Sequence, residues 1–198
     1  LNNSLDQKVK ERTQQLHELN AKLEQQMNTD ALTGAFNRRA LNHEIQQQFL
    51  QTRQQLQHTL VFAMLDVDYF KNYNDYYGHL KGDDVLKNLV RIIQQALPPS
   101  GYLARYGGEE FAILLTGMPV QTALKNLENV LEQIREQRME HLNRPDAKKY
   151  ITVSMGAAWT AQTHIYADIH ELMKAADVQL YAAKQAGRDQ LKIKKETD

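Results

Sequence analysis

The spacing of hydrophobic positions changes near residue 29, and this change divides the chain into two predicted regions. From Leu1 to about Asn28 there is no Gly or Pro, and one set of positions recurs alternately four and three residues apart. These positions are Leu5, Val9, Arg12, Leu16, Leu19, Leu23 and Gln26. The spacing is typical of the a and d positions of a coiled coil, with Arg12 and Gln26 as polar interruptions. We expect residues 1–28 to form a dimerising, signal-carrying helix; a single amphipathic helix folded back on the domain is the alternative.

Residues 29–198 alternate between strand-like apolar runs and helix-like apolar stripes. The run from Leu60 to Leu65 predicts a buried strand that ends at Asp66. Further strands are expected at 102–106, 111–115, 151–159 and 190–193. Helices are expected after Asn37, across 85–97 behind a loop rich in Tyr and Asn, from 119 to about 138, and from 169 to about 187. This order predicts an α/β (α+β) sandwich, with a central, mostly antiparallel sheet flanked by helices.

Composition narrows the classes of function. The chain has 198 residues, with 24 Lys plus Arg against 24 Asp plus Glu, so its net charge is zero. A neutral balance argues against a general nucleic-acid or anionic-membrane binder. The chain has no Cys, which excludes disulfides, thiolate metal sites and cysteine nucleophiles. The absence of Cys fits a reducing compartment, and we expect the domain in the cytoplasm. Because the chain opens at Leu1 rather than Met, we expect a fragment of a longer protein, with a sensor and any inner-membrane tether upstream.

Two acidic residues, Asp66 and Asp68, stand at the end of the predicted strand 60–65. Carboxylate oxygens suit Mg²⁺, which is usually held by one or two carboxylates together with substrate phosphates. The backbone carbonyl of Val67 would supply a further ligand. A pair of solvated loop acids is the alternative, and this segment alone does not decide between the two.

The segment Gly107-Gly108-Glu109-Glu110 separates two predicted strands and is expected to form a hairpin turn. The glycines permit backbone angles that other residues avoid and leave amides uncovered, so that phosphate can approach closely. Repulsion between two adjacent acids is relieved when a cation lies beside them. An exposed turn with solubilising acids is the alternative. The upstream Asp-x-Asp strand end favours a catalytic site.

Several ordered motifs give the chain a specific resemblance. They are Asp30-x-Leu32-Thr33-Gly34 with Asn37-Arg38-Arg39, Asp66-x-Asp68-x-Phe70-Lys71, Asn74-Asp75, Gly78-His79, Gly82-Asp83, Arg105-Tyr106, Gly107-Gly108-Glu109-Glu110-Phe111, Ala175-Ala176-Asp177, Tyr181, Ala183-Lys184 and Gly187-Arg188. From about Thr29 to Ile193 the chain resembles the GGDEF family of diguanylate cyclases, in the variant spelled Gly-Gly-Glu-Glu-Phe. The resemblance implies a fold similar to class III nucleotide cyclases and the polymerase palm.

The resemblance also implies an activity and a set of site residues. The reaction is that of a nucleotidyltransferase, which joins two GTP into cyclic di-GMP and releases two pyrophosphates. Mg²⁺, or Mn²⁺ in its place, would be bound by Asp66, Glu109 and the Val67 carbonyl. Glu109 would also take the proton of the attacking 3′-hydroxyl, with Glu110 in a supporting or second-metal role. The implied substrate contacts are Asn74 and Asp83 to guanine, His79 as a further contact, and Lys71, Lys184 and Arg188 to phosphates.

Partners follow from the same resemblance. Each protomer would hold one GTP, so a homodimer must bring two sites face to face, and the helix at residues 1–28 would help to dock them. An upstream sensor would control the domain, and no nucleic acid is expected. GTP is favoured over a mixed GTP and ATP substrate, because the Asp83 carboxylate can accept hydrogen bonds from guanine N1 and N2 but has no such partner on adenine.

Alternatives remain at this point. The positions aligned with the family's Arg-x-x-Asp product-inhibition site are Pro98-Pro99-Ser100-Gly101, so product is expected not to inhibit through that site. One alternative function is that of a catalytically inactive domain that binds GTP or cyclic di-GMP as a receptor. A coiled-coil signalling module, with the domain as dimerisation partner only, is another. His141 lacks a metal-like pairing in the sequence and is expected at the surface.

Overall fold

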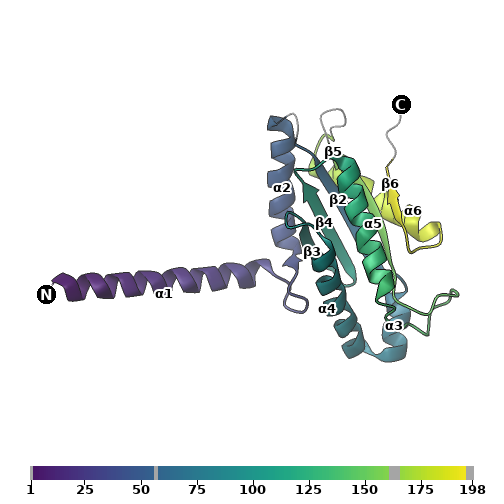
Figure 1. Ribbon diagram of the computed structural model, residues 1–198, viewed down its shortest axis with the longest axis horizontal. Helices are drawn as coiled ribbons and strands as arrows, with labels where there is room; N and C mark the ends of the chain where they lie inside the picture. Colours follow the sequence, from purple (N-terminus) through teal and green to yellow (C-terminus); the bar gives the residue numbers. More distant parts are fainter. Residues whose placement is uncertain (1, 56–57, 161–165, 195–198) are drawn as a thin grey trace.

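A long amino-terminal helix, α1 (Asn2–Asn28), extends away from the rest of the chain (Figure 1). The computed structural model describes residues 2–55, 58–160 and 166–194, without the side chains of 2–6 and 21–25. The predicted register positions Leu5 and Leu23 therefore lie outside the described side chains. Val9, Leu16 and Leu19 are 58%, 60% and 54% exposed. Since α1 does not fold back on the domain, its apolar positions remain open to a partner.

The remaining residues build one six-stranded mixed sheet with the order β1-β3-β4-β2-β5-β6. Its strands are β1 (Phe36–Asn37), β2 (Leu60–Val67), β3 (Tyr102–Gly107), β4 (Glu110–Thr116), β5 (Val153–Thr160) and β6 (Leu191–Ile193). The central strand β2 pairs antiparallel with β4 and β5, and β3 pairs antiparallel with β4. Among the strands that the structure describes, only β1 and β6, at the edges, pair in parallel. The predicted α+β sandwich with a mostly antiparallel sheet is confirmed.

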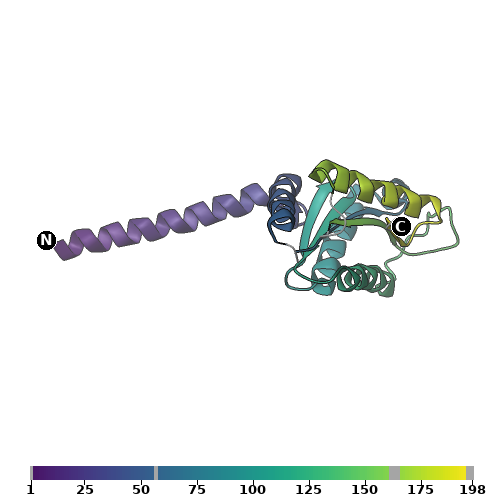
Figure 2. The ribbon, with the colours of Figure 1, turned by 90° about the horizontal axis from the view of Figure 1, so that it is seen from above.

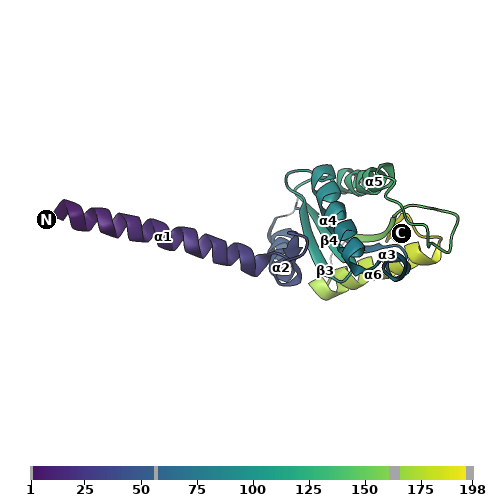
Figure 3. The ribbon, with the colours of Figure 1, turned by 90° about the horizontal axis from the view of Figure 1, so that it is seen from below.

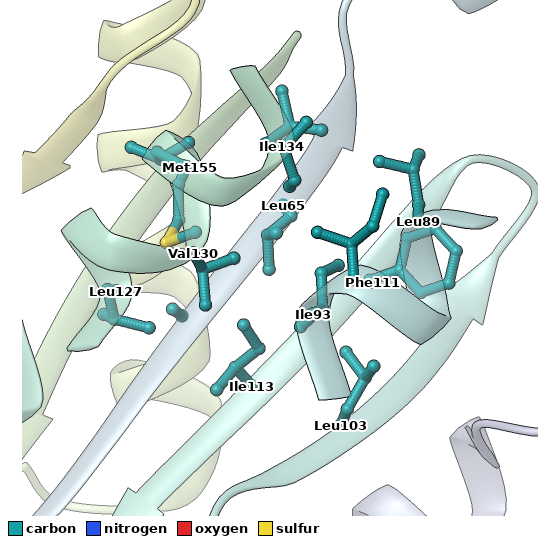
Figure 4. Close-up of a cluster of buried hydrophobic side chains, with 14 of the residues drawn as sticks. Leu65, Leu89, Ile93, Leu103, Phe111, Ile113, Leu127, Val130, Ile134 and Met155 are labelled. Carbon is teal, nitrogen blue, oxygen red and sulfur yellow. The ribbon is translucent and has the colours of Figure 1, made fainter. Parts of the chain in front are cut away.

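Helices cover both faces of the sheet (Figures 2 and 3). On one face lie α4 (His79–Ala96) and α5 (Val120–Glu136), and on the other α2 (Arg38–Gln54) and α6 (Ile169–Gln185). Alternate residues of β2 enter the two cores: Leu65 faces α4 and α5, whereas Phe62 faces α2 and α6. On the α4–α5 face, Phe111 lies among Leu89, Ile93 and Leu103 (Figure 4). The first residue after the two acids of the turn is thus anchored in the core.

Helix α6 lies very close to β5 at Gly156. A Cβ atom built on Gly156 would stand 2.0 Å from the Leu180 nitrogen and 2.3 Å from the Ala176 carbonyl oxygen. Only glycine permits this approach, because the neighbouring atoms are helix backbone. The close contact fixes α6 against the sheet, so Lys184, one turn after Leu180, lies over the end of β2.

The segment expected to be a loop rich in Tyr and Asn is instead a helix, α3 (Phe70–Tyr77). Tyr69 precedes it in a left-handed conformation with φ 57°, and Phe70, Tyr73 and Tyr77 stack at helical spacing on one side. Aromatic packing overrides the low intrinsic helix propensity of this segment.

Among helices in the described ranges, none has the length and apolar character needed to cross a membrane.

Candidate active site

The end of β2 and the β3–β4 turn bring three carboxylates to one place. Asp66 pairs with Glu110 across the β2–β4 ladder, and the Val67 amide donates to the Glu109 carbonyl oxygen at 3.4 Å. Gly108 occupies the turn with φ 52°, and both Glu109 and Glu110 are half-buried. The tight turn therefore places two acids beside the acid at the strand end.

Lys184 from α6 supplies the positive charge of this cluster. Its Nζ lies 2.9 Å from Asp66 Oδ2, and the Asp66 side chain is only 14% exposed. Burial raises the pKa of Asp66 to about 6; Lys184 acts to lower that pKa, whereas the Glu109 and Glu110 carboxylates act to raise it. The cluster thus has one ammonium group for three carboxylates.

The donor atoms at this end fit a hard divalent cation. Carboxylate oxygens from two adjacent strands and a nearby backbone carbonyl are the ligand types that Mg²⁺ and Mn²⁺ prefer. No group of three acidic or histidine side chains in the described part of the chain is already gathered in metal-binding geometry. Instead, the Lys184 ammonium group forms an ion pair with Asp66 and supplies positive charge at this position.

Asp68, the second acid of the strand end, has a different environment. It is 1% exposed and accepts hydrogen bonds from Thr152 Oγ1 at 2.6 Å, Ser154 Oγ at 2.6 Å and the Asp189 amide at 3.1 Å. Three donors use most of the acceptor capacity of this carboxylate. Asp68 therefore ties β5 and the turn after α6 to the end of β2, and only Asp66 of the pair faces the acidic turn.

Arg188 lies in the turn between α6 and β6, where its φ is 63°. Its guanidinium stacks 4.3 Å from the Tyr69 ring and donates from Nη1 to the Tyr69 hydroxyl at 3.1 Å. The next residue, Asp189, forms ion pairs with Arg135 and Lys148. These contacts hold the turn on both sides, so the Arg188 guanidinium is directed toward Tyr69, the residue before α3.

Buried groups support Tyr69 from below. The side chain of Arg144 is fully buried, stacks 5.0 Å from the Tyr69 ring and pairs with Asp146 at 2.7 Å. His141 is also fully buried, with its Nε2 3.1 Å from the Tyr69 carbonyl oxygen and its ring edge-on to Tyr73. The prediction that His141 lies at the surface is wrong. Burial lowers the pKa of His141, so a neutral ring packs under α3.

The remaining predicted substrate residues gather at the corner between α3 and α4. Asn74 lies on α3 and Asp83 on α4, and both are half-buried; Lys71 and His79 are exposed. No described residue forms a side-chain hydrogen bond or ion pair with any of these four groups. Among the described residues, the polar side-chain atoms of this corner thus remain unpaired, in contrast to the paired charges at the end of β2.

The junction between α1 and the domain contains contacts that the sequence did not predict. The Met27 carbonyl oxygen at the end of α1 accepts from Asn37 Nδ2 and Arg39 Nη2, each at 2.8 Å. Arg105 pairs with Asp30 at 3.0 Å and donates to the Gly108 carbonyl oxygen from Nε at 2.9 Å and Nη2 at 2.7 Å. One guanidinium therefore joins the start of the domain to the residue before Glu109.

Comparisons with known proteins agree with this arrangement. Residues 27–190 match the family model described as "Diguanylate cyclase, GGDEF domain". A diguanylate cyclase of Vibrio cholerae is 35% identical over 172 residues, which cover 87% of this chain and 51% of that protein. The chain spans about a quarter to a half of the length of the curated relatives that it matches.

Solved structures give the same result for the fold. The coiled coil and GGDEF domain of DgcB from Caulobacter crescentus, in complex with c-di-GMP, has a TM-score of 0.79 at 28% identity and covers 96% of this chain and 100% of that one. The active GGEEF domain of a Vibrio cholerae diguanylate cyclase has a TM-score of 0.67 at 32% identity, covering 81% and 98%. Sequence and fold agree over most of the chain, which therefore belongs to the GGDEF family of diguanylate cyclase domains.

Proposed function

We propose that this domain condenses two GTP molecules into cyclic di-GMP and releases two pyrophosphates. The observation that carries the proposal is the meeting of Asp66, the Glu109–Glu110 turn and Lys184 at one end of the sheet, in a chain of the GGDEF family. In each step a 3′-oxygen of one GTP forms a bond to the α-phosphorus of the other. The bond from that phosphorus to pyrophosphate breaks in line.

A divalent cation, Mg²⁺ or Mn²⁺, would be held by the carboxylates of Asp66 and Glu109 and the Val67 carbonyl. Bound there, it would neutralise charge on the triphosphate and polarise the α-phosphate. Burial is the main cause of the raised pKa of Asp66, and the Glu109 and Glu110 carboxylates add to it; a cation bound there would favour the charged form of Asp66, which supports this assignment. Lys184 would then move from Asp66 to a phosphate oxygen, together with Arg188 and Lys71.

Glu109 is proposed as the general base for the 3′-hydroxyl proton. Glu109 lies in a glycine turn, and Phe111 is buried two residues later. The backbone that carries the Glu109 carboxylate is therefore held in place. Glu110 lies opposite Asp66 and supports the same negative cluster. Its role is therefore electrostatic, next to the proposed metal site.

The corner between α3 and α4 is proposed to hold the guanine base. The Asn74 carboxamide and the Asp83 carboxylate offer donor and acceptor groups that match the O6, N1 and N2 edge of guanine. Neither side chain has a hydrogen-bond partner among the described residues, so neither is already committed to a protein group. His79, at the first residue of α4, is proposed as a further substrate contact.

The proposed catalyst is a homodimer, since one chain offers one such site. The exposed apolar positions of α1 supply a dimerising surface, and face-to-face domains would bring the 3′-oxygen of each GTP to the other α-phosphorus. A sensor region elsewhere in the full protein would control this docking, and the domain would act in the cytoplasm, where GTP is available. The residues at 98–101 lack Arg and Asp, so inhibition by product through that segment is not part of the proposal.

Incubation with GTP and Mg²⁺, with separation of the nucleotides by chromatography, tests the proposal. We expect cyclic di-GMP from the wild-type chain and a loss of about a thousandfold or more in Glu109→Gln, which removes the base and a proposed metal ligand. Glu128→Gln, an exposed position on α5, is the matched control and should retain full turnover. Tight binding of GTP or cyclic di-GMP without turnover would instead identify a receptor.

A further inference from the structure

The corner between α3 and α4 is built around two turns of helix that meet at Gly78. Gly78 has φ 85° and ψ 158°, a conformation open essentially to glycine alone. Its amide donates to the Asn74 carbonyl oxygen at 2.8 Å, and its own carbonyl oxygen accepts from the Gly82 amide at 3.2 Å. Asn74 therefore lies one turn before the corner and Gly82 one turn after it, facing each other.

Gly82 leaves almost no space between the two helices. A Cβ atom built at this position would stand 1.9 Å from Asn74 Oδ1, 3.0 Å from Asn74 Cγ and 3.1 Å from Phe70 Cζ. The closest atom belongs to the end of a flexible side chain, whereas the contact with the Phe70 ring needs only a small adjustment. A methyl group at position 82 would therefore displace the Asn74 carboxamide and leave the helix backbones in place.

Within the described part of the chain, the Asn74 carboxamide has no hydrogen-bond partner. Its Oδ1 atom is buried against Gly82, and no described residue donates a hydrogen bond to it. A buried polar atom without a partner is uncommon in proteins and calls for a reason such as a ligand site. Its location is set by the shape of the corner at Gly82, since no hydrogen bond determines it.

Helix propensity gives a second reason to look for a function at Gly82. Glycine inside a helix is less favourable than alanine, and Gly82 lies in the second turn of the 18-residue helix α4. If the position served only to form the helix, alanine would be the better residue. The near contact with Asn74 is the feature of the structure that opposes alanine.

From this geometry we infer that Gly82 is a positioning residue that sets the preference for guanine by fixing the place of the Asn74 carboxamide. The inference rests on the proposed function, because it takes Asn74 as the group that reads the base. Gly82 itself contacts Asn74 and not the nucleotide. Its effect on binding must therefore pass through Asn74 and disappear when the carboxamide is absent.

A double-mutant cycle tests this inference. Binding of the non-cleavable α,β-methylene analogues of GTP and ATP is measured by calorimetry for the wild-type chain, Gly82→Ala, Asn74→Ala and the double variant. We expect Gly82→Ala and Asn74→Ala each to weaken the GTP analogue about tenfold and to leave the ATP analogue unchanged. The double variant should bind the GTP analogue as Asn74→Ala does, within about twofold.

Thermal unfolding and a matched control separate positioning from folding. Gly82→Ala should keep or raise the melting temperature, because alanine favours the helix. Asn88→Ala, an exposed position on α4, should leave both analogues unchanged. If Gly82→Ala unfolds the chain, the double variant with Asn74→Ala decides the question. A folded double variant supports the contact between position 82 and Asn74, and an unfolded one overturns the inference.

The remaining outcomes are distinct. Equal GTP binding in wild type and Gly82→Ala overturns the inference and leaves the proposed function intact. An undiminished effect of Gly82→Ala in the Asn74→Ala background does the same, because Gly82 would then act through another group. A wild-type chain that does not prefer the GTP analogue to the ATP analogue overturns both.

Discussion

The two ends of the proposed nucleotide site differ in how their polar groups are satisfied. At the phosphate end, formed by Asp66, Glu109, Glu110, Lys184 and Arg188, the two cations already have partners, Asp66 for Lys184 and Tyr69 for Arg188. At the base corner, formed by Asn74, Gly82 and Asp83, no described residue pairs with the Asn74 or Asp83 side chain. The protein thus assembles one end in advance and leaves the other open.

The difference follows from the cost of burial for charged and neutral groups. A charge removed from water without a partner is far more unfavourable than an amide in the same position. Asp66 is therefore paired before any nucleotide arrives, whereas the Asn74 carboxamide can remain unpaired at moderate cost. We expect the phosphate end to supply affinity that does not depend on the base, and the base corner to discriminate guanine from adenine.

Among the variants that compare the two ends, the largest effect on nucleotide binding is expected for Lys184→Met at the phosphate end. Without the ammonium, Asp66 remains beside Glu109 and Glu110 with no positive charge, so binding of the triphosphate should weaken about a hundredfold, or roughly 3 kcal/mol. GTP and ATP analogues should lose equally in calorimetry. Lys174→Met, at an exposed position on the same helix, is the control. A loss confined to GTP would show that the two ends are not separate in function.

Asp68→Asn should reduce stability without selecting between nucleotides. The carboxamide places an NH₂ group where Thr152, Ser154 and the Asp189 amide now donate, so the free energy of unfolding should fall by about 2 kcal/mol. Urea denaturation measures the change. Asp75→Asn, at an exposed position on α3, should differ little from wild type. An unchanged midpoint would mean that Asp68 does not support the phosphate end.

Arg105→Ala should slow turnover by about tenfold while GTP binding changes little. Arg105 holds the Gly108 carbonyl oxygen before Glu109 and pairs with Asp30, but it is not placed on the nucleotide. Initial rates with GTP and Mg²⁺, set against binding of the GTP analogue, give the comparison. Arg91→Ala, exposed on α4, serves as the control. A parallel loss of binding would place Arg105 in the phosphate end itself.

The smallest effect concerns the pH dependence of stability beneath the phosphate end. The hydrogen bond from Arg144 lowers the pKa of Asp146 below its ordinary value of 3.8. The pair therefore stabilises the fold above that value, and this contribution is lost as the pH falls through the lowered pKa. Wild type should exceed Asp146→Asn in stability at pH 7, and the gap should close toward pH 3. A gap that widens in acid would contradict the assignment.

The parts predictable from the sequence were those carried by local patterns. The apolar run of β2 and the alternation around the glycine turn gave the centre of the sheet, and the acids at Asp66, Glu109 and Glu110 fell at the ends of those strands. Helix α3 was missed because Tyr and Asn are weak helix formers, and its stability comes from ring packing against the domain.

The supporting contacts were beyond local patterns because they join distant segments. Asp68 meets Thr152 and Ser154 across 84 and 86 positions, and Asp30 meets Arg105 across 75. An aspartate next to a site has the same appearance in a sequence whether it faces a ligand or lies under the floor of the site. The burial of His141 was hidden for the same reason, since its partner is the Tyr69 backbone 72 positions away.

The junction below α1 also has a mechanical consequence. Asn37 and Arg39 both bind the Met27 carbonyl oxygen near the end of the helix, and the following chain is joined through Asp30 and Arg105 to the Gly108 carbonyl oxygen. The junction is not a flexible hinge: a rotation of α1 about its own axis would stretch or break each of these hydrogen bonds. Torque applied far out on the helix would reach the residue next to Glu109 through a single guanidinium.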